Sequence, residues 1–164
     1  FDADTIIVVY TTIMVSASKS SQIKNGRITW QCACFNSRKA ARAVTKFYDD
    51  MLAPSGLKAT QLTMLGAISI LGTAQMSELA SLVALDKATL TRNLKLLQSD
   101  GLIAISTGSD RRVRVVRLTN TGTDTLERAL PLWREAQQRM VEHLGETRWR
   151  RLVADLAELN AISP

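Results

Sequence analysis

Residues 76–119 carry the pattern that most constrains what this chain can fold into. The segment 76–83 predicts a short amphipathic helix, and 87–101 predicts a second one after a tight turn. Two runs rich in β-branched residues, 102–106 and 113–118, are joined by a tip with Gly, Ser and Asp, which is typical of a β-hairpin. The residues expected to face inward from the two helices are Leu79, Ala80, Val83, Leu90, Leu94 and Leu97.

The second of these helices has recognisable ends and a face rich in hydrogen-bond donors. Asp86 is placed to accept its free N–H groups, and Gly101 can adopt the left-handed conformation that ends a helix. With the hairpin that follows, this order of elements predicts a winged helix-turn-helix, whose second helix would enter the major groove of DNA. The face opposite the leucines presents Lys87, Thr89, Thr91, Arg92 and Lys95.

Positive charge is concentrated in the same stretch. Residues 86–117 hold seven Lys and Arg against three Asp, so they contribute +4 of the chain's net charge of +6. Single Lys and Arg residues on a helix face are usually only solvated, but their clustering on this pattern favours double-stranded DNA as the partner. The basic residues of the hairpin, which would reach toward the DNA backbone or minor groove, are Arg111, Arg112, Arg114 and Arg117.

The run ELASLVALDKATLTRNLKLLQSDGLI, followed by DRR and RLTNTG, resembles the MarR family of bacterial transcription regulators over about residues 32–162. The resemblance implies a mainly α fold with a small β-hairpin wing, a winged helix-turn-helix with additional N- and C-terminal dimerisation helices. It also implies a homodimer that binds an inverted-repeat operator, usually as a repressor, and leaves DNA when a small phenolic ligand or an oxidant acts on it. The wing signature of the family is matched by Asp110, Arg112, Leu118, Thr119 and Gly122.

Side-chain chemistry predicts how the second helix would contact DNA. Thr89, Thr91 and Arg92 would face base edges, and the Arg92 guanidinium could make a bidentate contact to guanine. Lys87 and Lys95 would contact phosphates and hold the register.

The resemblance extends these contacts to the wing. It implies that Arg112 enters the minor groove and that Asp110 braces this arginine without touching DNA. Arg111 and Arg114 would then add contacts to the DNA backbone.

Composition bounds the remaining function classes. A hydrophobic content of 46% and a charged content of 22% are ordinary for one globular domain of 164 residues. Two Cys and one His make neither a disulfide framework nor a metal site, and no carboxylate spacing supports one, so neither secretion nor a metal or other cofactor is expected. No apolar run approaches the ~20 residues of a membrane span. The expected location is the cytoplasm, on the nucleoid when bound to DNA.

The domain organisation follows from these assignments. Residues 1–29 form an extension to which no role is assigned, and 30–164 form one MarR-like domain. Within that domain the winged helix covers about 55–120, and dimerisation helices cover about 32–52 and 122–162.

The helices outside the hairpin predict a homodimer. Thr60 is expected to cap a helix over about 60–71, one helix is expected over about 122–143, and another after Gly145. A small domain needs the helix over about 122–143 and the helix after Gly145 only if something covers their apolar stripes. In the resembling family these helices belong to the dimer interface. The alternative is that their stripes pack only within one chain. The stripe residues are Leu126, Leu130, Trp133, Gln137, Met140, Leu144, Trp149, Leu152, Val153, Leu156 and Leu159.

Cys34 is a candidate redox sensor. In the organic-hydroperoxide-sensing branch of the MarR family, a cysteine at this position becomes a sulfenic acid, and a helix N-terminus favours the reactive thiolate. Two tyrosines of that branch are replaced here by Arg38 and Ala59, so Tyr48 alone remains. The alternatives are a Cys34 that only packs as a small hydrophobe, and release by a small aromatic ligand. The similarity to that branch rests on Cys34, Phe35, Arg42, Val44, Thr45, Lys46 and Tyr48.

Two other classes of function compete with a sequence-specific regulator. One is a thiol peroxidase that uses Cys34, and the other is an architectural protein that coats DNA without sequence preference. The sequence shows no Ser/His/Asp set, phosphate loop or metal-ligand spacing, so no catalytic residue is assigned and an enzyme is not expected. The regulator explains the donor-rich helix and the basic hairpin together.

Overall fold

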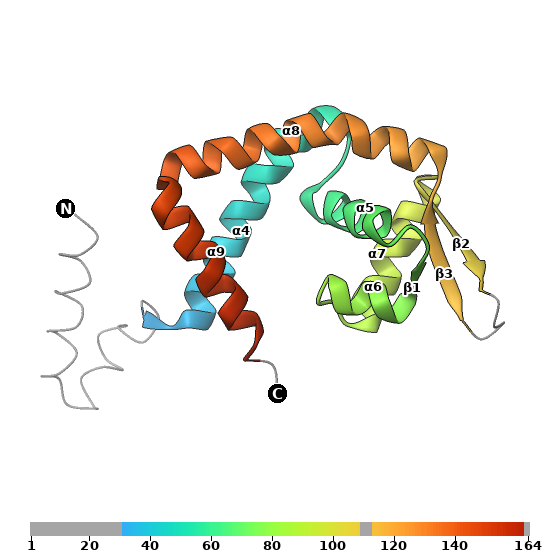
Figure 1. Cartoon of the computed structure of the whole chain (residues 1–164), viewed down its shortest axis with the longest axis horizontal. Helices are drawn as coiled ribbons and strands as arrows, with labels where there is room; N and C mark the ends of the chain where they lie inside the picture. Colours follow the sequence, from blue (N-terminus) through green and yellow to red (C-terminus); the bar gives the residue numbers. More distant parts are fainter. Residues whose placement is uncertain (1–30, 109–112, 163–164) are drawn as a thin grey trace, which may run out of the picture. The chain divides into compact units, whose positions relative to one another are not determined.

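The structure, a computed structural model, describes residues 31–108 and 113–162 (Figure 1). The chain divides into two compact units, Phe1–Val44 and Thr45–Pro164. The predicted boundary between residues 29 and 30 lies outside the described residues, so the assignment of an N-terminal extension stays a prediction.

The described part of the chain is mainly helical and contains one small sheet, which confirms the predicted fold class. Within residues 31–108 and 113–162, no helix has the length and apolar character needed to cross a lipid bilayer. In chain order the elements are α4 (Ala33–Leu52), the 3-10 helix η1 (Ala53–Ser55), α5 (Ala59–Leu71), β1 (Ala74–Gln75), α6 (Met76–Leu82), α7 (Lys87–Ser99), β2 (Ile103–Thr107), β3 (Arg114–Leu118), α8 (Asn120–Leu144) and α9 (Glu146–Asn160).

The start of α5 differs from its prediction. The helix begins at Ala59, so the prediction that Thr60 caps it is wrong. The Ala59 N–H donates instead to Asp49 Oδ1 at 2.7 Å, and the Lys58 N–H donates to Gln61 Oε1 at 2.9 Å. A carboxylate from α4 therefore accepts the bond that a local hydroxyl was expected to accept, because the free N–H groups at a helix start donate to any well-placed oxygen.

The sheet has three antiparallel strands in the order β1-β3-β2. β2 and β3 form the predicted hairpin, with Ile103 opposite Leu118. β1 was not predicted; it pairs with the other edge of β3 and sets Ala74 opposite Val116. Two residues are too few to show the alternation that identifies a strand in sequence.

One hydrophobic core lies under the helix-turn-helix and the sheet. The inward face predicted for α6 and α7 is confirmed, with Ala80 and Val83 half-buried against the core and the four leucines fully buried. Because both helices rest on this core, the outer face of α7 is held in a defined orientation. The largest fully buried side chains are Leu52, Met64, Leu65, Ile68, Leu79, Leu90, Leu94, Leu97 and Val116.

Two helices follow the wing. α8 begins at Asn120, two residues before its predicted start, because the Thr119 hydroxyl caps it by accepting from the Gly122 N–H at 3.0 Å. It continues through Pro131 as one helix of 25 residues. Gly145, with φ at +78°, then separates α8 from α9 as predicted.

Candidate nucleic-acid interface

Helix α7 begins at a cap that its own sequence supplies. Asp86 Oδ1 accepts hydrogen bonds from the N–H groups of Ala88 and Thr89, each at 2.9 Å. The Thr89 hydroxyl donates to Asp86 Oδ2 at 2.7 Å. These bonds, led by the one from the Thr89 backbone, hold the pKa of Asp86 below its usual value. The predicted cap is confirmed.

The buried and exposed faces of α7 separate as the leucine spacing predicts. Its three inward leucines are at most 1% exposed. A helix of 13 residues with one fully buried stripe must turn the opposite side to solvent. The three cations that the sequence places on that side are all exposed: Lys87, Arg92 and Lys95.

The two threonines of this face are less free than predicted. Thr89 and Thr91 are half-buried, and the Thr91 hydroxyl donates to the Lys87 carbonyl at 2.7 Å, as the Thr89 hydroxyl does to Asp86. Their oxygens can still accept hydrogen bonds, but donating to a base would cost an internal bond. Of the three side chains predicted to face base edges, Arg92 is the one that makes no hydrogen bond or ion pair with a described residue.

The C-terminal end of α7 turns the chain into the wing. Gly101 has φ at +72°, in the left-handed region, as predicted. Its N–H donates to the Gln98 carbonyl and the Leu102 N–H donates to the Leu97 carbonyl, both at 3.0 Å. This pattern satisfies the last carbonyls of the helix and reverses the chain, so β2 leaves directly from the end of α7.

The wing presents part of its predicted basic set. Arg114 and Arg117 lie on β3 and are exposed. The tip between β2 and β3 holds Asp110, Arg111 and Arg112, which lie outside the described residues, so their roles stay predictions.

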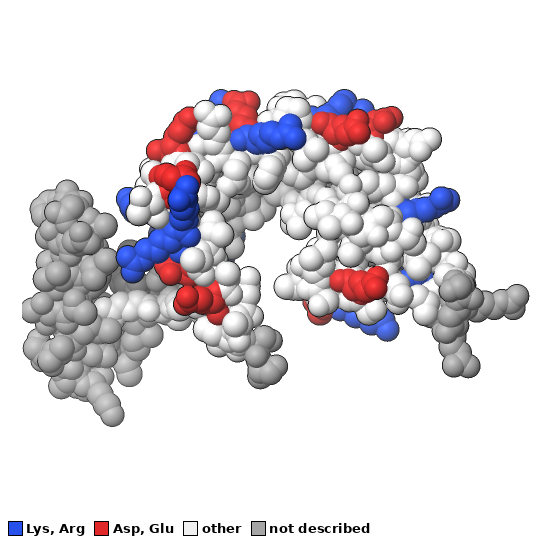
Figure 2. Space-filling view, viewed as in Figure 1, with Lys and Arg blue, Asp and Glu red and all other residues white. Residues whose placement is uncertain are grey.

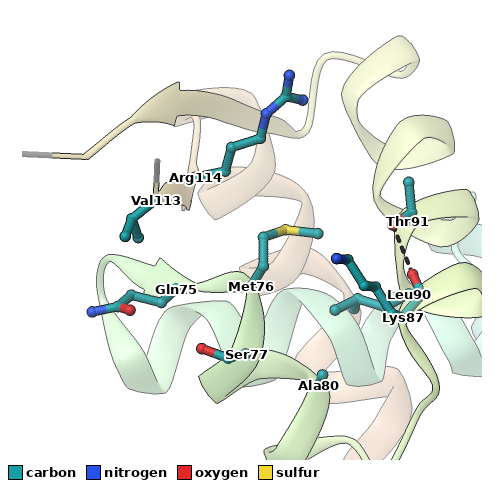
Figure 3. A pocket seen from close by; sticks show the side chains of 9 residues that line it. All are labelled: Gln75, Met76, Ser77, Ala80, Lys87, Leu90, Thr91, Val113 and Arg114. Carbon is teal, nitrogen blue, oxygen red and sulfur yellow. Dashed lines mark hydrogen bonds between the residues drawn. The ribbon is translucent and has the colours of Figure 1, made fainter. Parts of the chain in front are cut away.

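A hollow of about 580 Å³ opens between α6, the start of α7 and β3 (Figure 3). Met76 and Lys87 project toward its middle from the two helices, and Arg114 stands on the strand side. Neither Met76 nor Val113 was predicted as a site residue, because nothing in their spacing shows that the ends of α6 and β3 meet. The hollow joins the N-terminal end of α7 to the base of the wing in one concave basic surface. Its lining is Gln75, Met76, Ser77, Ala80, Lys87, Leu90, Thr91, Val113 and Arg114.

The cations of this surface have no acidic partner among the described residues. The ion pairs in the described part of the chain lie away from this surface and join side chains four residues apart within α4, α8 and α9, as in Lys46–Asp50. Figure 2 shows acidic and basic side chains interspersed along α8 and α9. Lys87 and Arg114 of this surface, and Arg92 and Lys95 further along α7, make no ion pair with a described residue.

The two candidate sensor residues differ in environment. Cys34 lies in the first turn of α4 and is exposed, whereas the alternative role of a small core hydrophobe requires a buried thiol. Tyr48, in the other compact unit, donates its hydroxyl to Gln137 Oε1 on α8 at 2.7 Å, and burial raises the pKa of Tyr48. The structure therefore gives Tyr48 a contact with α8 within the unit Thr45–Pro164.

Comparison with known proteins identifies the family. The model of the MarR family matches residues 55–113. The transcriptional regulator MosR of M. tuberculosis, in a structure with DNA, is 40% identical to this chain; the match covers 79% of this chain and 93% of MosR, with a TM-score of 0.73. This chain belongs to the MarR family. As a MarR-family protein it is a DNA-binding transcription regulator and not an enzyme, which sets aside the thiol peroxidase.

Two further relatives agree with this assignment. A probable transcriptional regulator from Pseudomonas aeruginosa is 27% identical, with a TM-score of 0.72 over 79% of this chain and 97% of its own. The HTH-type transcriptional regulator YwoH of Bacillus subtilis is 30% identical over 81 residues, which are 49% of this chain and 59% of YwoH. The MarR-family chain thus spans little more than half the length of this curated relative.

Proposed function

We propose that this MarR-family regulator is a homodimeric repressor that binds an inverted-repeat operator. In the proposal it leaves the operator when a small aromatic ligand binds or when Cys34 is oxidised. The observation that carries the proposal is the outer face of α7, opposite the buried leucine stripe, where three exposed cations have no acidic partner among the described residues. The similarity to MosR, which forms a complex with DNA, supports DNA as the partner.

Sequence would be read mainly by one side chain of α7. Arg92 has open donors and can bind O6 and N7 of guanine in bidentate fashion. Thr89 and Thr91 would act as acceptors toward base amino groups, since their hydroxyl hydrogens have internal partners. Lys87 and Lys95 would contact phosphates, which give affinity and register without sequence preference.

The wing would add contacts on the backbone and in the minor groove. Arg114 is exposed beside the hollow, and so it can reach a phosphate. In the proposal Arg112 enters the minor groove, Asp110 braces it, and Arg111 meets the backbone, as the family resemblance implies.

A second copy of the chain would cover the apolar stripe of α9. Four large aliphatic side chains of this helix are 40–48% exposed in the single chain. Side chains of this kind exposed in a row along one helix mark an interaction surface. Two-fold pairing would place two α7 helices about one DNA turn, roughly 34 Å, apart, so that the operator is an inverted repeat. The four side chains are Leu152, Val153, Leu156 and Leu159.

Release by oxidation would use the exposed thiol of Cys34. The thiolate attacks one peroxide oxygen of an organic hydroperoxide, the S–O bond forms as the O–O bond breaks, and the departing alkoxide takes up a proton to become an alcohol. Sulfur is oxidised to a sulfenic acid. A small aromatic ligand between the dimerisation and DNA-binding helices is the other proposed effector.

The test is fluorescence anisotropy of the full chain against a library of duplexes at constant salt, with and without an organic hydroperoxide. Selection of an inverted repeat is expected. Arg92→Ala should lose about 1–3 kcal/mol on that repeat and much less on random DNA, whereas Lys95→Ala, the matched control on the same helix, should weaken binding to both alike. Affinity lost on oxidation and kept in Cys34→Ser would establish the thiol switch.

Three results would contradict parts of the proposal. Equal affinity for every duplex would indicate an architectural protein and would contradict binding to a specific operator. Equal losses on operator and random DNA for Arg92→Ala would remove the assigned role of Arg92. Selection of an inverted repeat with the same affinity in the presence and absence of the oxidant would contradict release by oxidation of Cys34. The proposed repressor would then stand with a small aromatic ligand as its effector.

A further inference from the structure

Thr119 joins the end of the recognition helix α7 to the start of α8. Its hydroxyl donates to the Gly101 carbonyl at 2.7 Å and accepts from the Gly122 N–H at 3.0 Å. Its own N–H donates to the Leu102 carbonyl at 3.1 Å. One residue thus bonds both to the turn that ends α7 and to the first turn of α8.

The two segments also touch backbone to backbone. A Cβ built on Gly122 would lie 1.9 Å from the Leu102 carbonyl oxygen and 2.9 Å from its carbon. Gly122 is buried and has no side chain, so the backbone of α8 lies directly against the backbone of Leu102. Such a contact cannot relax by a change of rotamer, which makes the joint stiff.

The joint lies where a small rotation has a large effect on DNA. Helix α7 has 13 residues and is therefore about 20 Å long. A rotation of about 10° at its C-terminal end would move its N-terminal end by about 3.5 Å, close to the rise of one base pair. The same joint leads into α8 and then α9, whose exposed stripe is the proposed dimer surface.

We infer that Thr119 and Gly122 are positioning residues that set the spacing between the two half-sites the dimer recognises. This inference rests on the proposed function, because spacing has a meaning only for a dimer on an inverted repeat. Neither residue needs to touch DNA for this. They act through α7, whose angle to α8 they hold.

The test measures spacing preference in the full chain. Duplexes carry the selected half-sites at the best spacing and at one and two base pairs more or less. Thr119→Val removes both hydroxyl bonds at almost constant shape, and Thr119→Ser keeps them. Thr123→Val is the matched control, because the Thr123 hydroxyl bonds to the Thr119 carbonyl at 3.2 Å, within one helix turn, and to no other described residue.

The expected result is a sharp optimum for the wild type, Thr119→Ser and Thr123→Val. In Thr119→Val the ratio of affinities between the best spacing and its neighbours should fall by at least about fivefold, because each of the two lost hydrogen bonds corresponds to a factor of about five. A general loss of stability would lower all affinities together and leave this ratio unchanged.

Other outcomes separate the two proposals. A wild type with an optimum and a Thr119→Val variant with the same ratio would overturn the inference alone. A wild type without any optimum would remove the proposed operator and the inference with it. If Thr119→Val does not fold, amide exchange in the wild type decides: Gly122 and Thr119 must be as protected as the core of α7, and faster exchange there would overturn a stiff joint.

Discussion

A methyl group added at Gly122 would clash with the neighbouring backbone. The added carbon would meet the Leu102 carbonyl oxygen at 1.9 Å, whereas carbon and oxygen atoms in close contact normally stay about 3.3 Å apart. The first turn of α8 and the end of α7 would therefore have to separate by roughly 1.4 Å. This separation also lengthens the hydrogen bond from the Thr119 hydroxyl to the Gly101 carbonyl, which joins the two segments.

Two terms set the size of the effect. Overpacking in a tight site costs about 1–3 kcal/mol, and the weakened hydrogen bond adds about 1 kcal/mol. The better helix propensity of alanine returns only about 0.5–1 kcal/mol. Gly122→Ala should therefore lower the free energy of unfolding by about 2 kcal/mol.

Gly66 provides the matched control. It lies in α5, and a Cβ built there meets nothing within 4 Å. Gly66→Ala should raise the free energy of unfolding by about 0.5–1 kcal/mol, because alanine loses less backbone entropy on entering a helix. The same chemical change thus has opposite signs at two helical glycines.

The assay is urea denaturation followed by circular dichroism, with all proteins at one concentration because the stability of a dimer depends on it. Gly122→Ala should move the midpoint down and Gly66→Ala should move it up. A Gly122→Ala variant as stable as the wild type would refute the reasoning, since the two backbones could then not be in contact.

Three further predictions concern other parts of the chain. The pKa of Asp86 is depressed in the folded state, so the charged carboxylate stabilises the fold fully above its usual pKa of 3.8, and this stabilisation is lost as pH falls through the folded pKa. In an acid titration, the difference in free energy of unfolding between the wild type and Asp86→Asn should therefore shrink in that pH range. The raised pKa of Tyr48 acts oppositely, so the free energy of unfolding of the wild type should fall as pH rises above 10. Tyr48→Phe should be about 1 kcal/mol less stable at neutral pH, because it loses the hydrogen bond to Gln137, but its stability should not fall further at alkaline pH. Leu156→Glu should give a monomer in sedimentation velocity, while Leu82→Glu, a change at a residue of similar exposure on α6, should not.

Local contacts explain why much of the winged helix could be predicted from sequence. The Asp86 cap joins residues two and three apart, and the Gly101 turn depends on one residue with φ at +72°. The leucine stripe of α7 follows from helical period alone. The hairpin joins neighbouring segments of the chain. Each of these features is determined within a few residues, so the sequence carries it without knowledge of the fold.

The features that sequence analysis missed join distant residues. The edge strand β1 pairs across to Val116, and the first turn of α5 is capped from Asp49, ten residues earlier and on another helix. Thr119 reaches back 18 residues to Gly101. The hydroxyl of Thr89 is an exception, because its bond to the Asp86 carboxylate spans only three residues and belongs to the same local cap.

The sequence by itself therefore determined the order of elements, the family and the cationic face of α7. Tertiary structure decided how α7 is joined to α8, where β1 pairs and which side chain caps the start of α5. The physical reason is range: helix period, caps and turns act over a few residues, whereas sheet edges, backbone contacts and the partners of polar groups depend on packing between segments far apart in the chain.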